Sequence, residues 1–118
     1  MDFEEEKHGE VVVGLVSGRV DGLAAPEFEQ YLNGIVERGD KDVLLDCSGM
    51  DYISSAGLRA LLVGARACQQ NGGNLALCAL KPECKKVLEV SGFFAFLESF
   101  DTREDALAAE QDWVGRGA

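Results

Sequence analysis

A strand that leads directly into the start of a helix is the part of this sequence that most restricts its fold. Residues 43–45 form an apolar run of strand length, and Asp46-Cys47-Ser48-Gly49 follows it. After a short loop, Ser54 and Ser55 stand at the start of an amphipathic helix. Such a junction places hydroxyl groups beside unpaired backbone N–H groups and the positive end of the helix dipole. A phosphoryl group would be tolerated there, so a phosphorylation switch is the first hypothesis for this site.

Strands alternate with helices along the rest of the chain. Apolar or β-branched runs predict strands at residues 11–16, 42–46 and 75–80, a short strand after residues 93–97, and an N-terminal hairpin strand at residues 3–7. Helical spacing predicts helices that begin near Pro26, Ser55, Pro82 and Thr102. Residues 18–22 break the pattern and are predicted to form a loop. This order indicates an α/β fold in a single domain of residues 1–118, with a core at about 9–112 and fraying expected for residues 114–118.

The net charge of −10 restricts the partners that the chain could bind. A nucleic-acid backbone requires a basic face, so nucleic acid is not expected as a partner, and anionic membrane surfaces are disfavoured for the same reason. No apolar run approaches the ~18 residues of a membrane-spanning helix, and the acidic N-terminus lacks the apolar segment of a secretory signal. We therefore expect a cytoplasmic protein that does not act at a membrane.

Metal and cofactor sites find little support in the sequence. The cysteines lack C-x-x-C spacing and the chain has one histidine, His8, so a zinc site is not predicted. Buried free thiols explain the cysteines better: Cys47, Cys68, Cys78 and Cys84. Three acids could meet at the carboxyl edge of the sheet, but such residues are more often loop acids and caps than metal ligands: Asp21, Asp46 and Asp51. Neither a metal nor a cofactor is expected.

Enzyme motifs in the chain are incomplete. Ser55-Ala56-Gly57 resembles the second half of a G-x-S-x-G nucleophile elbow, but Ile53 occupies the first glycine position. A serine nucleophile also needs a base within hydrogen-bond reach, and the one histidine lies in the acidic N-terminal segment. The glycine-rich motifs of P-loop and dinucleotide-binding proteins are missing from the sequence. We predict no catalytic residue and no enzymatic activity.

The two serines also have a purely structural interpretation. One of them is expected to be the N-cap of the helix, accepting a hydrogen bond from a backbone N–H two or three residues later. Free N–H groups at the start of the helix, such as those of Gly57 and Leu58, would be available to a phosphate. The residues alone leave open whether capping is all that Ser54 and Ser55 do.

Residues 46–58 resemble the signature of STAS domains, specifically the bacterial anti-sigma factor antagonists. The resemblance extends beyond this loop. Residues 18–21 are similar to the family's G-x-hydrophobic-D loop, residues 73–78 to its next strand, and residues 87–93 to its hydrophobic-x-x-S-G-hydrophobic segment. Together these segments cover roughly residues 9–112. The resemblance implies the STAS (SpoIIAA-like) fold, with a mixed four- to five-stranded sheet and about four helices.

The resemblance also implies a protein-binding module that phosphorylation of one serine switches off. By position that serine is Ser55, with Ser54 as the second choice because it stands where the family often has an acid. In the family, an anti-sigma factor with ATP-dependent serine kinase activity adds the phosphoryl group and a metal-dependent serine phosphatase removes it. The unphosphorylated form captures the anti-sigma factor and frees the sigma factor, a partner switch that regulates transcription. The implied partner surface comprises Asp21, which matches the family's acid near the serine, with Ser54, Ser55, Ala56, Gly57, Leu58 and Arg59.

Charge explains how such a switch would work. Phosphoserine carries about −1.5 to −2 charges near neutral pH, and burying an unpaired dianion under a partner is costly. Asp21 and Asp51 are expected to add like-charge repulsion, so phosphorylation should weaken binding without unfolding the chain. The alternative is a STAS domain that serves as a structural or regulatory subunit of a transport or signalling complex without kinase control. In either case we expect a monomer or a weak dimer.

Overall fold

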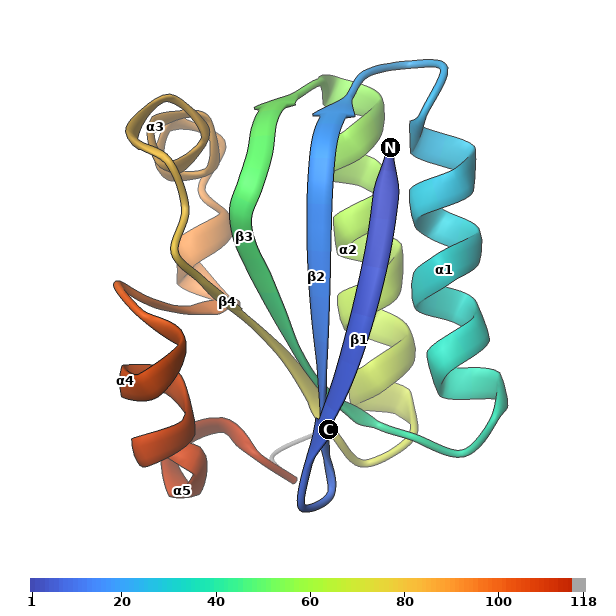
Figure 1. Ribbon diagram of the computed structural model, residues 1–118, viewed down its shortest axis with the longest axis vertical. Coiled ribbons are helices and arrows are strands. Elements are labelled where there is room, and N and C mark those ends of the chain that lie inside the picture. Colours follow the sequence, from blue (N-terminus) through green and yellow to red (C-terminus); the bar gives the residue numbers. More distant parts are fainter. Residues whose placement is uncertain (116–118) are drawn as a thin grey trace.

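The computed structural model of the chain describes residues 1–115 and shows one mixed sheet with helices on both faces (Figure 1). The elements follow in the order β1 (Asp2–His8), β2 (Val11–Val20), α1 (Ala25–Glu37), β3 (Asp42–Ile53), α2 (Ser55–Gln70), β4 (Asn74–Cys78), α3 (Pro82–Val90), a short 3-10 helix (Phe93–Ala95), β5 (Glu98–Phe100), α4 (Arg103–Ala108) and α5 (Glu110–Trp113). This alternation confirms the α/β fold class. The last predicted helix is divided at Ala109, so the described residues contain five α-helices where about four were expected.

The five strands lie in the order β1-β2-β3-β4-β5. β1 pairs antiparallel with β2, which confirms the predicted N-terminal hairpin, and the other neighbouring strands pair in parallel. Parallel neighbours place their carboxyl ends at the same edge of the sheet. The β2–α1 and β3–α2 junctions therefore lie side by side, at the upper end of the molecule in Figure 1.

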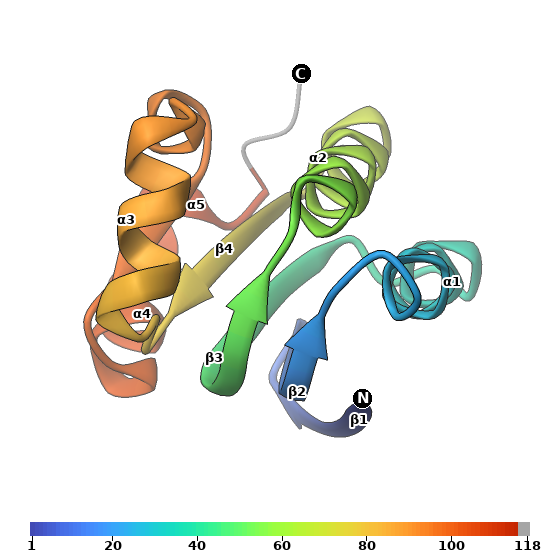
Figure 2. The same cartoon turned by 90° about the horizontal axis from the view of Figure 1, so that it is seen from above.

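Two clusters of buried side chains hold the layers together. The larger cluster packs α1, α2 and α3 against one face of the sheet, with Phe28, Leu61 and Leu88 among its members. The smaller one packs α4 and α5 against the other face, where the fully buried Trp113 donates a hydrogen bond from Nε1 to the Ala106 carbonyl at 3.0 Å. Figure 2 shows α1 and α2 on one side of the sheet and α4 and α5 on the other.

The central strands are longer than the sequence pattern predicts. A loop was expected at residues 18–22 and another after residue 46, but β2 continues to Val20 and β3 to Ile53. Parallel pairing between the two strands persists to the pair Val20–Ile53, with register shifts on the way. Burial of Val20 and Ile53 stabilises this extension even though glycines and polar residues interrupt the apolar run. The extension carries both strands as far as the serine junction.

The C-terminal end of the described chain packs against the sheet. Val114 contacts the smaller core cluster, and the Gly115 N–H donates to the buried Asp42 carboxylate at 2.8 Å. Fraying was expected for residues 114–118; Val114 is half-buried, and Gly115 is exposed but makes this hydrogen bond. Residues 116–118, the rest of that expectation, lie outside the described part of the chain.

All four cysteines are buried free thiols, as the sequence predicted. Burial raises the pKa of the Cys68 thiol to about 12 and that of the Cys78 thiol to about 12. Thiols with such pKa values stay protonated near neutral pH and are poor nucleophiles. The cysteines therefore act as small apolar side chains of the core.

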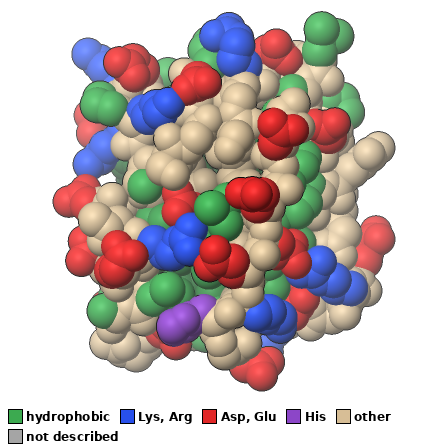
Figure 3. Space-filling view, viewed as in Figure 1, with side chains coloured by type: hydrophobic (Ala, Val, Ile, Leu, Met, Phe, Trp, Pro, Cys, Tyr) green, Lys and Arg blue, Asp and Glu red, His purple; other side chains and the backbone are tan. Residues whose placement is uncertain are grey.

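An ion-pair network joins three distant parts of the chain. Acidic and basic side chains lie close together on the face seen in Figure 3. The Arg103 guanidinium donates to the buried Asp46 carboxylate at 3.0 and 3.1 Å and to Glu6 at 2.9 Å. Burial acts to raise the pKa of Asp46, but hydrogen bonds from Ser48 and Arg103 outweigh it, so the pKa lies below its usual value. The network therefore stabilises the charged form of Asp46 and links β1, β3 and α4.

Stability should depend on pH through this carboxylate. Because the folded pKa lies below the unfolded value of ~3.9, the stabilisation is complete above that value and is lost as the pH falls through the folded pKa. Asp46→Asn is expected to lower the free energy of unfolding by about 1–3 kcal/mol at neutral pH, and the gap from wild type should shrink in strong acid. Urea unfolding at neutral pH and in strong acid measures this difference in the free energy of unfolding. Asp101→Asn, at an exposed carboxylate, is the control. An equal gap at both pH values would contradict the assignment.

Candidate functional site

Ser54 joins the two strand-to-helix junctions. Its hydroxyl donates to the Val20 carbonyl at 2.9 Å and accepts from the Gly57 N–H at 3.1 Å. Its backbone N–H also donates to the Val20 carbonyl, at 2.8 Å. Ser54 is thus the N-cap of α2, which confirms that one of the two serines caps this helix. The Ser54 hydroxyl thus both donates and accepts a hydrogen bond, and the residue is half-buried.

Ser55 is the first residue of α2 and is exposed, as is Ala56 after it. Among residues 1–115 no hydrogen bond is made by the Ser55 hydroxyl. The Gly57 and Leu58 N–H groups were expected to be free for a phosphate, and this was wrong: the Ser54 hydroxyl and carbonyl accept them at 3.1 and 2.8 Å. The first-turn amides that remain for an anion are those of Ser55 and Ala56. The two neighbouring serines therefore have different surroundings.

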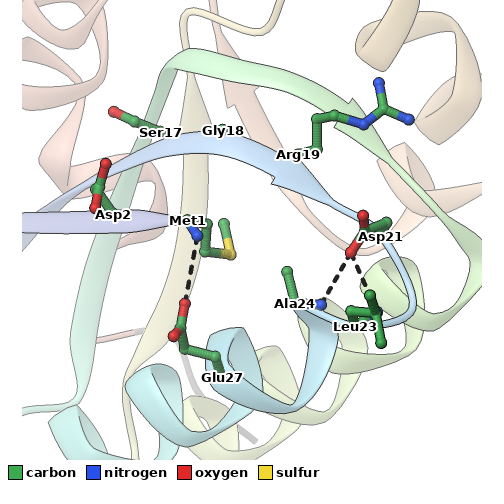
Figure 4. A pocket seen from close by; sticks show the side chains of 9 residues that line it. All are labelled: Met1, Asp2, Ser17, Gly18, Arg19, Asp21, Leu23, Ala24 and Glu27. Carbon is green, nitrogen blue, oxygen red and sulfur yellow. Dashed lines mark hydrogen bonds and ion pairs between the residues drawn. The ribbon is translucent and has the colours of Figure 1, made fainter.

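Asp21 shapes the loop between β2 and α1. Its Oδ1 accepts hydrogen bonds from the backbone N–H groups of Leu23 at 3.1 Å and Ala24 at 3.0 Å, both drawn in Figure 4. These bonds fix the backbone of the loop, in which Leu23 is 93% exposed. The same loop lines an open hollow of about 560 Å³ together with Arg19 and Glu27. Leu23 was missed from the sequence, where the one signal is an apolar residue within a polar loop.

A pair of side chains at the ends of the central strands was also missed. The Arg19 guanidinium lies 4.3 Å from the centroid of the Tyr52 ring, and both residues are exposed. Such cation–π contacts order a surface arginine at modest energetic gain. Neither residue belongs to an apolar pattern that the sequence could reveal, because their contact depends on the pairing of β2 with β3.

The acids that the sequence singled out do not meet. Asp46 pairs with Arg103, and Asp51 forms a close ion pair with Lys81. The Asp51 carboxylate raises the pKa of Lys81, and the pairing neutralises the charge that was expected to repel a phosphate. Within the described residues no group of three or more His, Cys, Asp or Glu side chains could hold a metal ion. In the same residues no helix is both long and apolar enough to cross a membrane.

The predicted partner residues thus divide into a scaffold and a surface. Gly57 is buried, Leu58 is half-buried against the core, and Ser54 is the cap. The exposed set consists of Ser55, Ala56 and Arg59, and Leu23 with Tyr52 extends it. At one end of the sheet this surface presents the apolar side chain of Leu23, the hydroxyl of Ser55 and the guanidinium of Arg59. Such an arrangement suits contact with a protein and offers one hydroxyl for modification.

Comparisons with known proteins agree with this geometry. The family model of the STAS domain matches residues 2–106. A Bordetella bronchiseptica protein named as a putative anti-sigma factor antagonist, BtrV, is 38% identical over 109 residues, which cover 92% of this chain and 94% of that protein. The crystal structure of an anti-sigma factor antagonist from Mycobacterium paratuberculosis superposes with a TM-score of 0.84 at 25% identity, covering 94% of each chain.

The Bacillus protein SpoIIAA shares the fold at lower identity. Its unphosphorylated form superposes with a TM-score of 0.71 at 18% identity, covering 94% of this chain and 98% of that one. Its phosphorylated form gives a TM-score of 0.69 at 21% identity, covering 91% and 97%. The family model spans most of the chain, and the BtrV match covers nearly all of both proteins. The chain therefore belongs to the STAS domain family, in the group of the anti-sigma factor antagonists.

Proposed function

We propose that the unphosphorylated chain binds an anti-sigma factor with serine kinase activity, frees a sigma factor, and is switched off by phosphorylation of Ser55. The observation that carries the proposal is the difference between the two serines. The Ser54 hydroxyl is engaged on both sides as the helix cap, whereas the Ser55 hydroxyl is exposed on the candidate surface. The chain acts as a binding protein and as a kinase substrate, not as an enzyme, in the bacterial cytoplasm.

The switch consists of one phosphoryl transfer and its reversal. The Ser55 oxygen attacks the γ-phosphorus of ATP held by the kinase, the bond to the β-phosphate oxygen breaks, and ADP leaves. The hydroxyl proton passes to a base of the kinase or to water. A serine phosphatase restores the hydroxyl by hydrolysis, releasing inorganic phosphate. The chain itself contributes the exposed hydroxyl and its presentation at the start of α2.

The phosphate fits the chain alone better than it fits the complex. In the free chain, the dianion lies near the unpaired amides of Ser55 and Ala56 and near the positive end of the α2 dipole. Under a bound partner the same charge loses its water, and an unpaired buried charge costs several kcal/mol. Binding is therefore lost while α2 stays folded.

Release of a sigma factor tests the proposal directly. The purified chain is added to a complex of its anti-sigma factor kinase with the sigma factor, and size-exclusion chromatography follows the free sigma factor. We expect release by the wild-type chain and clearly less release by Ser55→Glu, whose carboxylate carries less charge than a phosphate. Failure of the wild-type chain to bind this kinase would overturn the proposal. It would favour the alternative, a subunit of a transport or signalling complex without kinase control.

A further inference from the structure

Arg59 is an exposed cation near the start of α2 that has no counter-ion in the described chain. α2 carries two arginines, Arg59 and Arg66, and no acid, although the protein as a whole has a net charge of −10. The ion pairs among residues 1–115 include neither of these arginines. Arg59 is the fifth residue of α2, in the N-terminal half of the helix, where the helix dipole offers a cation no stabilisation. Its position is explained if an anion joins it.

Arg59 follows Ser55 by four positions, and both residues are on the same exposed side of α2. In a helix, residues at this separation have Cβ atoms about 5–6 Å apart. Side chains lean toward the helix N-terminus, so the long Arg59 side chain extends in the direction of Ser55. An anion placed four residues before a cation is also the favourable order of such a pair. A phosphate on Ser55 therefore lies within reach of the Arg59 guanidinium.

Other nearby groups are already engaged. Lys81 pairs with Asp51, and Arg19 stacks on Tyr52. The N–H groups of Gly57 and Leu58 bond to Ser54. Arg66 lies 11 positions beyond Ser55, which is about three helical turns or roughly 16 Å along the axis. Arg59 is thus the cation of α2 that is both unpaired and close enough.

We propose that Arg59 is a phosphate latch, free to pair with an acidic side chain of the anti-sigma factor in the unphosphorylated protein and captured by the Ser55 phosphate afterwards. This inference rests on the proposed function for its partner. The planar guanidinium donates two parallel hydrogen bonds to phosphate oxygens, the strong geometry for such pairs. Phosphorylation then changes the partner surface twice, because it adds an anion and withdraws a cation.

The phosphate itself reports whether the latch forms. Phosphoserine is inserted at position 55 of the full chain during translation, so no kinase is needed, and its second pKa, ordinarily near 6, is measured by phosphorus NMR. A neighbouring guanidinium lowers this value. We expect Arg59→Gln to raise the titration midpoint by about half a pH unit, a threefold change, Arg59→Lys to raise it less, and the matched control Arg66→Gln to leave it unchanged. Equal midpoints in the Arg59→Gln and Arg66→Gln chains would overturn the latch.

A binding cycle tests the second half of the inference. Calorimetry compares the anti-sigma factor kinase with wild type, Arg59→Gln, the phosphoserine chain and the doubly changed chain. Arg59→Gln should weaken the unphosphorylated complex about tenfold, and the loss caused by phosphoserine should be smaller in Arg59→Gln than in wild type. An equal loss of affinity on phosphorylation in wild type and in Arg59→Gln would refute the capture of Arg59 by the phosphate. If the kinase binds no form of the chain, the proposed function fails, whereas the NMR result on the latch is unaffected.

Discussion

Ser55→Ala is expected to abolish the phosphoryl gain that the wild-type chain shows after incubation with ATP and its anti-sigma factor kinase. Ser54→Ala should retain the gain, because it leaves the Ser55 hydroxyl in place. It removes the helix cap, worth about 0.5–2 kcal/mol, and the hydroxyl's bond to the Val20 carbonyl, while the Ser54 backbone N–H still donates to that carbonyl. Intact-mass measurement of the three proteins shows the result. A phosphoryl gain that survives in Ser55→Ala and disappears in a folded Ser54→Ala would move the site to Ser54.

The phosphorylated chain should bind the same kinase at least 100-fold more weakly than the unphosphorylated chain. Even paired with Arg59, the dianion keeps uncompensated charge, and a buried charge without a partner costs about 3–5 kcal/mol. Hydrogen exchange of the free protein should change little across α2, because the phosphate is placed at the favourable end of the helix dipole. Ser55→Glu is expected to reproduce part of the loss of affinity. Melting of α2 on phosphorylation would contradict an electrostatic switch and indicate a folding switch.

Gly57→Ala is expected to destabilise the protein by about 1–2 kcal/mol, even though alanine is the better helix former. A Cβ at position 57 would lie 2.7 Å from Val20 Cγ1 and 2.9 Å from the Val20 carbonyl oxygen. The same carbonyl accepts the hydrogen bonds of Ser54, so the clash falls on the contact that joins the two junctions. Thermal or urea unfolding measures the change.

Gly34→Ala provides the matched control for Gly57→Ala. Gly34 lies in α1 and is exposed, and a Cβ added there would point into open space, with no neighbouring side chain within 4 Å. The substitution there should stabilise the chain by about 0.5–1 kcal/mol through helix propensity. The two variants should thus differ by about 1.5–3 kcal/mol and in opposite directions from wild type. A Gly57→Ala chain as stable as wild type would mean that the junction relaxes to accept a methyl group.

The order of elements followed from local pattern. The apolar spacing of Phe28, Leu32 and Ile35 predicted α1, and all three side chains are buried. The hairpin strand, the parallel strands and the helix after Ser55 were likewise predicted. The extent of β2 and β3 was not, since Val20 and Ile53 are buried by each other's strands and by α2 and not by their sequence neighbours. Length of a central strand depends on its partner, which a local pattern does not contain.

The residues of the candidate site were likewise predicted only in part from the sequence. Motif resemblance pointed to Ser54 and Ser55, to Asp21 and to the first turn of α2. Leu23 and the Arg19–Tyr52 pair were missed because single exposed side chains carry no periodic signal. Asp51 was expected to repel a phosphate, but Lys81, 30 residues away, neutralises it. The sequence therefore did not reveal that the charge of Asp51 is paired.

Two adjacent serines at the start of an amphipathic helix could be recognised without coordinates, because capping preference and apolar periodicity are properties of neighbouring residues. Which of the two hydroxyls is engaged and which is exposed depends instead on tertiary structure. Ser54 is held by the Val20 carbonyl, 34 residues earlier, and that carbonyl reaches it only after β2 and β3 have paired in parallel. Folding thus engages the Ser54 hydroxyl and leaves the Ser55 hydroxyl exposed, and a long-range hydrogen bond is the physical reason for that difference.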